Sequence, residues 1–335
     1  MFLALMAMRR LHPERKAVVL PAWCCPSVAQ AVIQAGLRPV LADLDAGSLA
    51  YSEESLAGSV TPDTLAVLLV HFFGLPVPAP ALPQPPPFFL RDCAQDFLFR
   101  RDRDHDLPTF YSFGRGKSLN GGHGGALCLP PGSPLLAPGR EILEGFPPAS
   151  NPLPKLLLIN WLSHPLAFGA LSRLSFLRIG ETRWESPLAF TRMHPDFHRL
   201  AGPLLDALEE NLPAYGALIG EYAGLAAASQ GSASVPGPGY AAGKAPIRFP
   251  LLISDPALRA RFMDGMNAAF GGVTGQYPEL LPKLPGAPAL DPGGPYAGSE
   301  RIAKRIVTLP VTSWLRQDRG AFLALARKLL SGAHG

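Results

Sequence analysis

Three side chains that can do chemistry lie at the ends of predicted strands. Asp92 ends the apolar run FFLRD, and Ser112 and Lys117 leave the run TFYSF, five residues apart, into the glycine-rich loop SFGRGKSLNGGHGG. A buried carboxylate can pair with a cation, a hydroxyl can bind an anion, and a lysine amine can act as a nucleophile. Hydroxyls together with the backbone N–H groups of a glycine-rich loop are suited to phosphate. The combination predicts a site for a phosphorylated cofactor that reacts with an amine.

Pyridoxal phosphate (PLP) needs this set of groups. A carboxylate beside the pyridine nitrogen keeps the ring protonated and makes it an electron sink. A lysine forms the imine with the cofactor aldehyde and later moves the substrate proton. Asp92 and Lys117 can take these two roles, and Ser112 can bind the phosphate.

The elements that must position these groups follow the pattern of a βα-wound sheet. Between residues 17 and 129, short apolar runs alternate with helical or loop segments. The predicted strands are 17–20, 39–43, 65–71, 88–92, 109–113 and 124–128. Ligands of such sheets bind outside the carboxyl ends of the strands, so we expect Asp92, Ser112 and Lys117 to meet in one crevice.

The remaining segments suggest a second, smaller unit. Proline excludes a helix from the connection 74–87. A loop rich in Gly, Ser and Pro ends a long amphipathic segment. The predicted fold class is α/β, with a large domain at 1–205 built on a mostly parallel sheet and a small C-terminal α/β domain at 206–335. The other predicted elements are helices at 27–35, 53–57, 195–227 and 256–270, a helix ending near 330, and strands at 247–253 and 305–310.

The composition narrows the class of protein. The chain has 335 residues, 47% of them hydrophobic, which is enough for a substantial core. The net charge of +4 comes from scattered Lys and Arg, without the basic run interleaved with aromatics that nucleic-acid binding favours. The four cysteines lack zinc-site or disulfide-scaffold spacing. The start, MFLALMAMRR, is apolar before it is basic, so we interpret it as a helix tail rather than a secretory signal and expect a cytoplasmic protein.

Several segments, in order along the chain, resemble the DegT/DnrJ-type sugar aminotransferases. The resemblance covers most of the chain and is loose between 135 and 190. TPDTLAVLLVHFFG is similar to the family's TPxTxAxxxVHxxG, DCAQ to its DAAQ, and SFGRGKSLNGGHGGAL to its SFxxxKxLxxGxGGxL. The opening AVVLPAWCCPSVAQAVIQAGLRPVLADLD resembles its first strand, turn and helix, and AKRIVTLPV resembles its AxRxLxLPx segment.

The resemblance implies a PLP-dependent transferase of fold type I. It would make Lys117 the Schiff-base lysine, Asp92 the partner of the pyridine nitrogen, Gln95 a neighbour of the ring and Ser112 a phosphate ligand. Enzymes of this family transfer an amino group, commonly from glutamate, to a keto-sugar nucleotide for cell-surface polysaccharide or antibiotic sugars. Their sites lie at a homodimer interface, so a homodimer is expected.

This sequence departs from the family pattern at three places. The chain begins after the position of the family's N-terminal phosphate-binding turn. Cys25 stands where the family usually stacks an aromatic ring on the cofactor, although Trp23 is close. FTRMHPDF resembles the family's NYRMxxxQ and carries Arg192 as a weak substrate candidate, but it has Phe190 in place of Asn. Tyr277, in GQYPEL, is a weak candidate for a substrate-side loop.

Two alternatives within the fold stay open. The departures at Cys25 and Phe190 motivate a catalytically degenerate protein of this fold with a binding or assembly role. A sugar dehydratase is less favoured, because those enzymes resemble the family but replace the lysine with histidine.

Other site classes are less consistent with the sequence. GRGKS resembles the end of a nucleotide-binding P-loop, but Tyr111 occupies the position of its first glycine. No metal site is expected, since neither His105 nor His123 has converging ligands nearby, and His71 is interpreted as a structural histidine. The apolar segment 156–177 is interrupted by polar residues, which predicts a buried or interface hairpin or a membrane-surface segment, the latter at the inner face of the membrane.

Overall fold

The large sheet has six strands, and its order places the predicted site residues on neighbouring strands. The computed structural model describes residues 1–96, 105–114, 116–151, 153–154, 184, 187–237, 239, 246–288, 290, 294–312 and 318–331. Five strands run parallel and the sixth, β6, pairs antiparallel with β5. In spatial order the strands are β2 (Arg38–Ala42), β1 (Ala17–Pro21), β3 (Thr64–Val70), β4 (Phe88–Asp92), β5 (Thr109–Ser112) and β6 (Gly125–Cys128).

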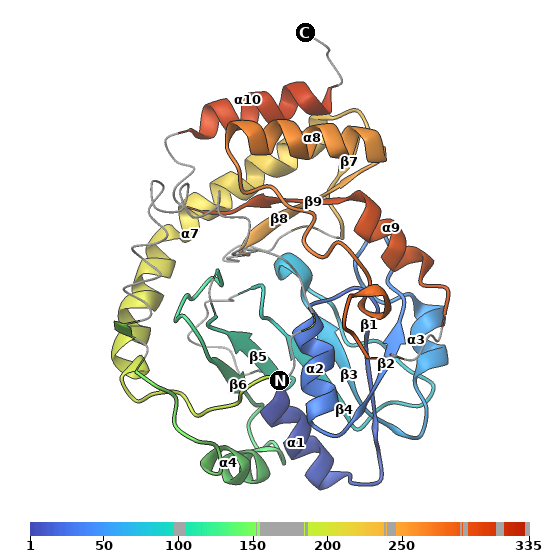
Figure 1. Cartoon of the computed structure of the whole chain (residues 1–335), viewed down its shortest axis with the longest axis vertical. Coiled ribbons are helices and arrows are strands. Elements are labelled where there is room, and N and C mark those ends of the chain that lie inside the picture. The colour runs from blue at the N-terminus through green and yellow to red at the C-terminus, as the bar shows by residue number, and fades with distance from the viewer. Residues whose placement is uncertain are drawn as a thin grey trace.

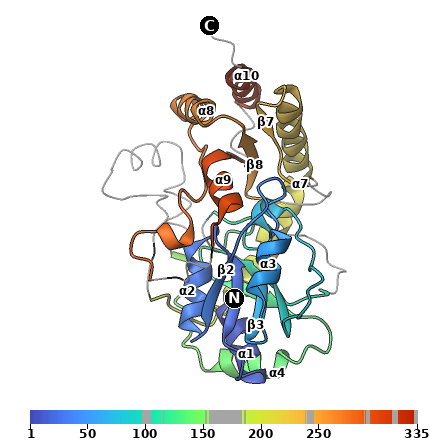
Figure 2. The same cartoon turned by 90° about the vertical axis from the view of Figure 1, so that its right-hand side faces the viewer.

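Helices cover both faces of this sheet, because its central strands are buried on both sides. All seven residues of β3 are buried, the near-continuous apolar pattern of a parallel strand between two layers. Val18 and Leu20 of β1 pack in the core cluster that contains α2, whereas Val19 packs with the cluster that contains α3. Figure 2 shows α2 and α3 on opposite sides of the sheet. The covering helices are α1 (Phe2–Leu11), α2 (Pro26–Gln34), α3 (Glu53–Ser59) and α4 (Leu136–Glu144).

A second sheet of three antiparallel strands forms the upper part of the molecule in Figure 1. Its core is aromatic and aliphatic, and it includes the fully buried Tyr222, Phe249, Phe262 and Phe322. The elements of this part are α7 (Phe197–Ala228), β7 (Ala233–Ser234), β8 (Arg248–Ile253), α8 (Pro256–Ala269), β9 (Ile306–Pro310) and α10 (Arg319–Leu330).

The predicted fold class is confirmed, with a mostly parallel six-stranded sheet and a smaller antiparallel unit. The predicted strands and helices are present with boundaries within a few residues, and the N-terminal stretch is helical, as α1. The structure adds α4, α9 (Ala297–Arg305), β7 and two short 3-10 helices, η1 (Phe72–Gly74) and η3 (Leu281–Lys283). The proposed division at 205/206 falls inside α7, and the two-domain boundary stays a prediction.

The segment 156–177 lies outside the described residues. Among the helices that the structure describes, none is long and apolar enough to cross a membrane.

Candidate active site

The carboxyl ends of β3, β4 and β5 lie side by side, and the site is built there. The N–H of His71, just after β3, donates to the carbonyl of Asp92 at 2.9 Å. The N–H of Cys93 in turn donates to the carbonyl of Phe110 on β5 at 3.0 Å. These bonds extend the ladder past the strand ends and fix the residues that follow. Asp92 ends β4 and Ser112 ends β5, so two of the predicted residues share this edge of the sheet (Figure 1).

Asp92 is a buried carboxylate, 5% exposed. Its Oδ1 accepts a hydrogen bond of 2.8 Å from the N–H of Ala94. Burial raises the pKa of Asp92, and the Ala94 N–H and the Lys117 ammonium act in the opposite direction. Desolvation is the larger effect because a carboxylate loses hydration in an apolar site. A cation placed against this carboxylate would stabilise its charged form.

Lys117 lies in the loop between β5 and β6, and its ammonium is near enough to lower the pKa of Asp92. The loop closes tightly: Phe113 N–H donates to Gly124 at 2.9 Å, and Gly121 N–H donates to Phe113 at 2.9 Å. Glycine is required at 121, since a Cβ there would lie 2.3 Å from a ring carbon of Phe197. The side chain of Lys117 is half-buried, so the loop presents it at the sheet edge without enclosing it.

Ser112 leaves β5 half-buried, with its hydroxyl accepting a long bond of 3.4 Å from the Gly114 N–H. The Ser112 hydroxyl at the end of β5 therefore lies beside the first backbone N–H groups of the loop. Asp92 and Ser112 therefore end neighbouring strands at one edge of the sheet, and Lys117 follows in the loop after β5. A shared crevice for the three side chains stays a prediction.

Gln95 connects this edge to a segment almost two hundred residues away. Its Oε1 accepts from the Phe73 N–H at 2.9 Å, and its Nε2 donates to the Tyr277 hydroxyl at 2.8 Å. Trp23 Nε1 donates to the Tyr277 carbonyl at 3.0 Å, and the two rings meet edge to face with centroids 5.1 Å apart. Three residues that the resemblance singled out separately, Gln95, Trp23 and Tyr277, thus form one buried network.

The two stacking candidates differ in their surroundings. Trp23 is fully buried and also packs on Phe72, with ring centroids 5.3 Å apart. Cys25 is half-buried at the start of α2, and its Sγ lies 3.0 Å from the Ser27 hydroxyl. Burial raises the pKa of the neighbouring Cys24 thiol well above its ordinary range. Whether Trp23 or Cys25 contacts a cofactor ring stays a prediction.

Phe190 and Arg192 belong to a different set of contacts. The Phe190 ring stacks on Phe2 of α1, with centroids 3.8 Å apart and planes 6° from parallel. The Arg192 N–H donates to Pro147 at 2.8 Å and its carbonyl accepts from Ala149 at 2.9 Å. The Arg192 side chain is exposed, and its substrate role stays a prediction.

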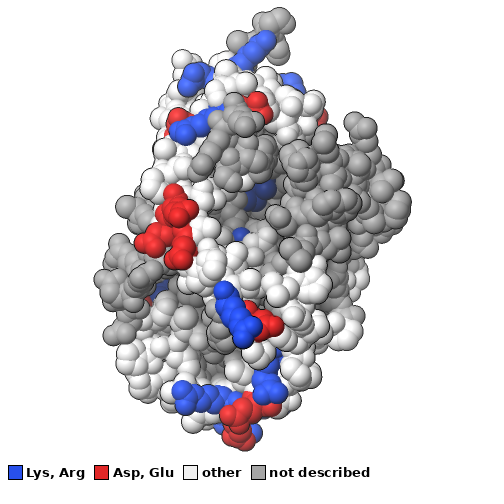
Figure 3. Space-filling model, turned by 90° about the vertical axis from the view of Figure 1, so that its left-hand side faces the viewer, with Lys and Arg blue, Asp and Glu red and all other residues white. Residues whose placement is uncertain are grey.

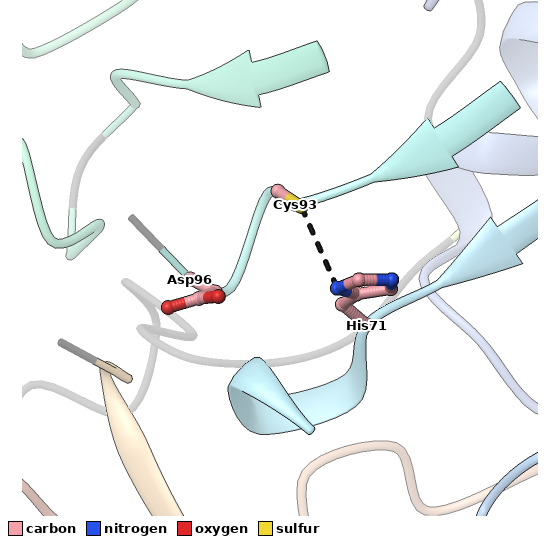
Figure 4. A group of neighbouring side chains, drawn as sticks. All are labelled: His71, Cys93 and Asp96. Carbon is pink, nitrogen blue, oxygen red and sulfur yellow. Dashed lines mark hydrogen bonds between the residues drawn. The ribbon is translucent and has the colours of Figure 1, made fainter. Parts of the chain in front are cut away.

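The structure also brings together three residues that the sequence analysis did not combine: His71, Cys93 and Asp96 (Figure 4). His71 follows β3, whereas Cys93 and Asp96 follow β4, and all three are buried. The useful signal was the spacing C-x-x-D directly after one strand together with a histidine directly after its parallel neighbour.

Charge is sparse on the face shown in Figure 3. The described charged side chains form small separate groups, and basic atoms lie inside a hollow near the middle of the face.

Comparison with known proteins gives a family match for the N-terminal part of the chain. Residues 1–130 match the model of the DegT/DnrJ/EryC1/StrS aminotransferase family. A dTDP-4-dehydro-2,3,6-trideoxy-D-glucose 4-aminotransferase of Saccharopolyspora spinosa is 41% identical over 59 residues, 18% of this chain and 15% of that protein. A 3-amino-5-hydroxybenzoate synthase of Amycolatopsis mediterranei (strain S699) is 32% identical over 126 residues, 34% of this chain and 32% of that protein. These matches span less than a third of each curated relative.

Solved structures match over nearly the whole chain. DesV of S. venezuelae aligns with a TM-score of 0.69 and 20% identity, covering 99% of this chain and 84% of that one. The sugar aminotransferase CalS13 of Micromonospora echinospora aligns with a TM-score of 0.69 and 18% identity, covering 99% and 85%. The fold is therefore that of the type I PLP-dependent aminotransferases. Residues 1–130 thus match the model of the DegT/DnrJ/EryC1/StrS aminotransferase family, and the chain as a whole has the fold of solved sugar aminotransferases such as CalS13.

Proposed function

We propose that this chain is a PLP-dependent aminotransferase that acts on a keto-sugar nucleotide in cell-surface polysaccharide biosynthesis, with glutamate as the amino donor. The family match and the names of two relatives, which describe a dTDP-dehydrosugar 4-aminotransferase and a UDP-N-acetyl-3-dehydro-glucosamine 3-aminotransferase, support the substrate class. The observation that carries the proposal is the buried Asp92 carboxylate, whose pKa responds to the Lys117 ammonium at the same sheet edge.

The residues of this edge fit PLP. Burial raises the pKa of Asp92, so the carboxylate is well matched to a protonated pyridine nitrogen, which would offset the desolvation. The Ser112 hydroxyl and the amides of the glycine loop offer donors suited to a phosphate. Lys117 supplies the amine that would hold the cofactor covalently. The site therefore contains a carboxylate for the pyridine nitrogen, donors for the phosphate and an amine for the aldehyde.

Within this site PLP would supply an electron sink that weakens the substrate Cα–H bond. Lys117 would accept that proton from the substrate Cα at its Nζ, as a general base. It would then donate the proton to a different carbon, as a general acid. Asp92 would keep its partner nitrogen protonated. Gln95, fixed by the Phe73 N–H and the Tyr277 hydroxyl, would hold the side of the site that faces the C-terminal part of the chain.

We further propose a cytoplasmic homodimer, in keeping with the family's shared sites. A contact of 156–177 with the membrane surface is an additional hypothesis about a segment outside the described residues. A degenerate protein of this fold with a binding or assembly role is the competing hypothesis, and it rests on Cys25 and Phe190.

The test is cofactor binding by the full chain and by Lys117→Ala. We expect purified protein with added PLP to develop the visible absorption band of a lysine-bound cofactor, and glutamate to bleach it. Lys117→Ala should lose the band. Lys283→Ala is the matched control, because Lys283 is an exposed lysine paired with Glu300 at a distance of 2.6 Å and should keep the band.

Substrate class is tested next by supplying dTDP- and UDP-linked keto-sugars with glutamate and detecting the amino sugar by mass spectrometry. Amination of a keto-sugar nucleotide supports the proposal. A folded protein with no band at saturating PLP would overturn the enzyme and support the degenerate hypothesis. A band with turnover only on a non-sugar ketone would overturn the substrate class alone.

A further inference from the structure

His71, Cys93 and Asp96 form a buried cluster with the donor set of a transition-metal site, and we propose that it binds zinc. One imidazole nitrogen, one thiol sulfur and one carboxylate oxygen all lie within 4.8 Å of one another. In Figure 4 the three side chains face one another from the ends of two adjacent strands. The site is separate from the proposed cofactor site, and the proposal does not depend on that function.

The distances suit tetrahedral coordination. Zinc bonds of about 2.3 Å to sulfur and about 2.0–2.1 Å to nitrogen, at tetrahedral angles, separate the two ligand atoms by about 3.6 Å. Cys93 Sγ and His71 Nδ1 are 3.7 Å apart. A pair at the 4.8 Å limit of the cluster would close by roughly 1 Å to reach the same value, which a rotation about a side-chain bond can provide. Three protein ligands leave a fourth position for water or a further donor.

The ligand types and their burial favour zinc over magnesium or calcium. Thiolate and imidazole select borderline and soft ions, whereas hard ions prefer all-oxygen sites. His71, Cys93 and Asp96 are 6%, 4% and 3% exposed. A thiolate and a carboxylate together with a divalent ion and a neutral imidazole have no net charge. That balance avoids leaving a charge uncompensated in the interior.

Backbone packing holds the carboxylate at the cluster. Gly74 has φ of +79°, and a Cβ at this position would lie 3.1 Å from Cγ of Asp96. The Gly74 N–H donates to the His71 carbonyl at 3.1 Å, and the Asp96 N–H donates to the Cys93 carbonyl at 3.2 Å. The turn after β3 and the turn after β4 are therefore pressed together with the three ligand atoms between them. Such prior placement lowers the ordering cost of binding a metal.

The cluster lies on the opposite side of the β4 end from Asp92. Successive strand residues point to opposite faces, and Cys93 packs in the apolar cluster with Tyr111, Phe113 and Phe197. A metal here would fix the turn from Asp92 to Asp96, which also carries Gln95. The role of the ion would be structural, because it would fix the position of Asp92 and Gln95 from the opposite side of the turn.

Cobalt(II) is the probe, because it takes zinc sites and is coloured. Titration of the full chain with Co²⁺ should produce visible d–d bands of tetrahedral intensity that saturate at one equivalent of Co²⁺ per chain. Added Zn²⁺ should remove these bands. Elemental analysis after dialysis against Zn²⁺ should give one ion per chain, and Zn²⁺ should raise the melting temperature. The Co²⁺ and Zn²⁺ binding should be the same with and without PLP, and the same in Lys117→Ala, because the metal site is separate from the cofactor site.

The variant Cys93→Ala should abolish the bands, and its affinity should fall by more than the about 10–100-fold typical of losing an outer-shell partner. Cys128→Ala, a half-buried thiol on β6, is the control and should bind as the parent does. Asp96→Asn is a second variant for the case in which Cys93→Ala does not fold, and it too should weaken binding. The proposal is overturned if the parent shows no tetrahedral bands and no retained zinc, or if Cys128→Ala weakens binding as much as Cys93→Ala.

Discussion

The two sheets of this protein use their buried polar groups differently. In the six-stranded sheet the buried His71, Asp92, Gln95 and Asp96 gather at the carboxyl ends of β3 and β4, whereas the buried Thr64 and Thr109 begin β3 and β5. In the three-stranded sheet the polar groups bond to local backbone and to each other. Thr308 on β9 bonds to the hydroxyl of Thr274 at 3.0 Å, and Arg248 donates to the Thr308 carbonyl at 2.8 Å.

This difference indicates that the six-stranded sheet carries the functional site, whereas the polar groups of the three-stranded sheet have a structural role. Desolvation lowers the pKa of Arg248 to about 10, yet its guanidinium is bonded to the hydroxyl and carbonyl of Thr308 in the same sheet and to the carbonyl of Gly272, which accounts for it structurally. Desolvation also acts on Asp92, where it raises the pKa because the charged form is the carboxylate, and the neighbours of Asp92 include a lysine in a glycine-rich loop. A perturbed carboxylate at a sheet edge with a nucleophile nearby indicates function.

The comparison is tested most strongly by Asp92→Asn. We expect catalytic efficiency to fall by about 10²–10³-fold, because the electrostatic partner of the cofactor is lost. Without cofactor, this variant should be at least as stable as the parent at neutral pH, since a buried charge is removed. Steady-state kinetics and denaturant unfolding of the cofactor-free protein measure the two effects.

The sign of the pH dependence follows from the raised pKa of Asp92. A group whose pKa is higher in the folded state contributes stability that is fully present below its ordinary value, 3.8 here, and is lost as pH rises through the folded value. That loss should be absent in Asp92→Asn. The control Asp106→Asn removes an exposed carboxylate, 2.8 Å from Arg91, and should leave activity unchanged. Equal activity losses in both variants would contradict the role of Asp92.

The packing of α9 against the loop that follows β2 is tested by Gly298→Ala. A Cβ at 298 would lie 1.8 Å from the carbonyl oxygen of Leu44, and the Asp43 carboxylate accepts from the Gly298 and Ser299 N–H groups at 2.8 and 2.7 Å. We expect a loss of about 3 kcal/mol in the free energy of unfolding, because backbone must move. Denaturant titration measures it.

Gly224→Ala is the matched control for this change. Gly224 lies on an exposed face of α7, and a Cβ there meets nothing within 4 Å. The same substitution should therefore stabilise the protein by about 0.5–1 kcal/mol, through helix propensity. Similar effects at both positions would show that α9 does not dock as described.

A smaller effect than that of Gly298→Ala is expected from the same chemical change made in each part: Tyr277→Phe and Tyr222→Phe. Each removes a buried hydroxyl, one that accepts from Gln95 at 2.8 Å and one that donates to Pro310 at 3.0 Å. Each should cost about 1–3 kcal/mol of stability, because a buried partner loses its hydrogen bond. Only Tyr277→Phe should also weaken PLP binding, measured by absorbance titration. Equal cofactor affinity in the two variants would remove Gln95 and Tyr277 from the site.

The features that could be predicted from the sequence are those set by patterns within a few neighbouring residues. Strands β1 and β3 were predictable because every residue in them is buried, which leaves uninterrupted apolar runs. The order of Asp92, Ser112 and Lys117 followed from the strand ends. Helix α9 was not predicted, because it is nine residues long and largely polar, with only Ser299, Ile302 and Ala303 buried. Its start is fixed by the Asp43 carboxylate, more than 250 residues earlier in the chain.

By itself the sequence determined the wound sheet and the three reactive groups at its edge, since periodicity and strand ends are written within a few residues of each other. Tertiary structure alone decided that Gln95 bonds to the Tyr277 hydroxyl and that Trp23 bonds to the Tyr277 carbonyl. It also decided that His71 meets Cys93 and Asp96. The physical reason is that these contacts depend on the register of parallel strands and on how distant turns pack, and neither leaves a local pattern in the chain.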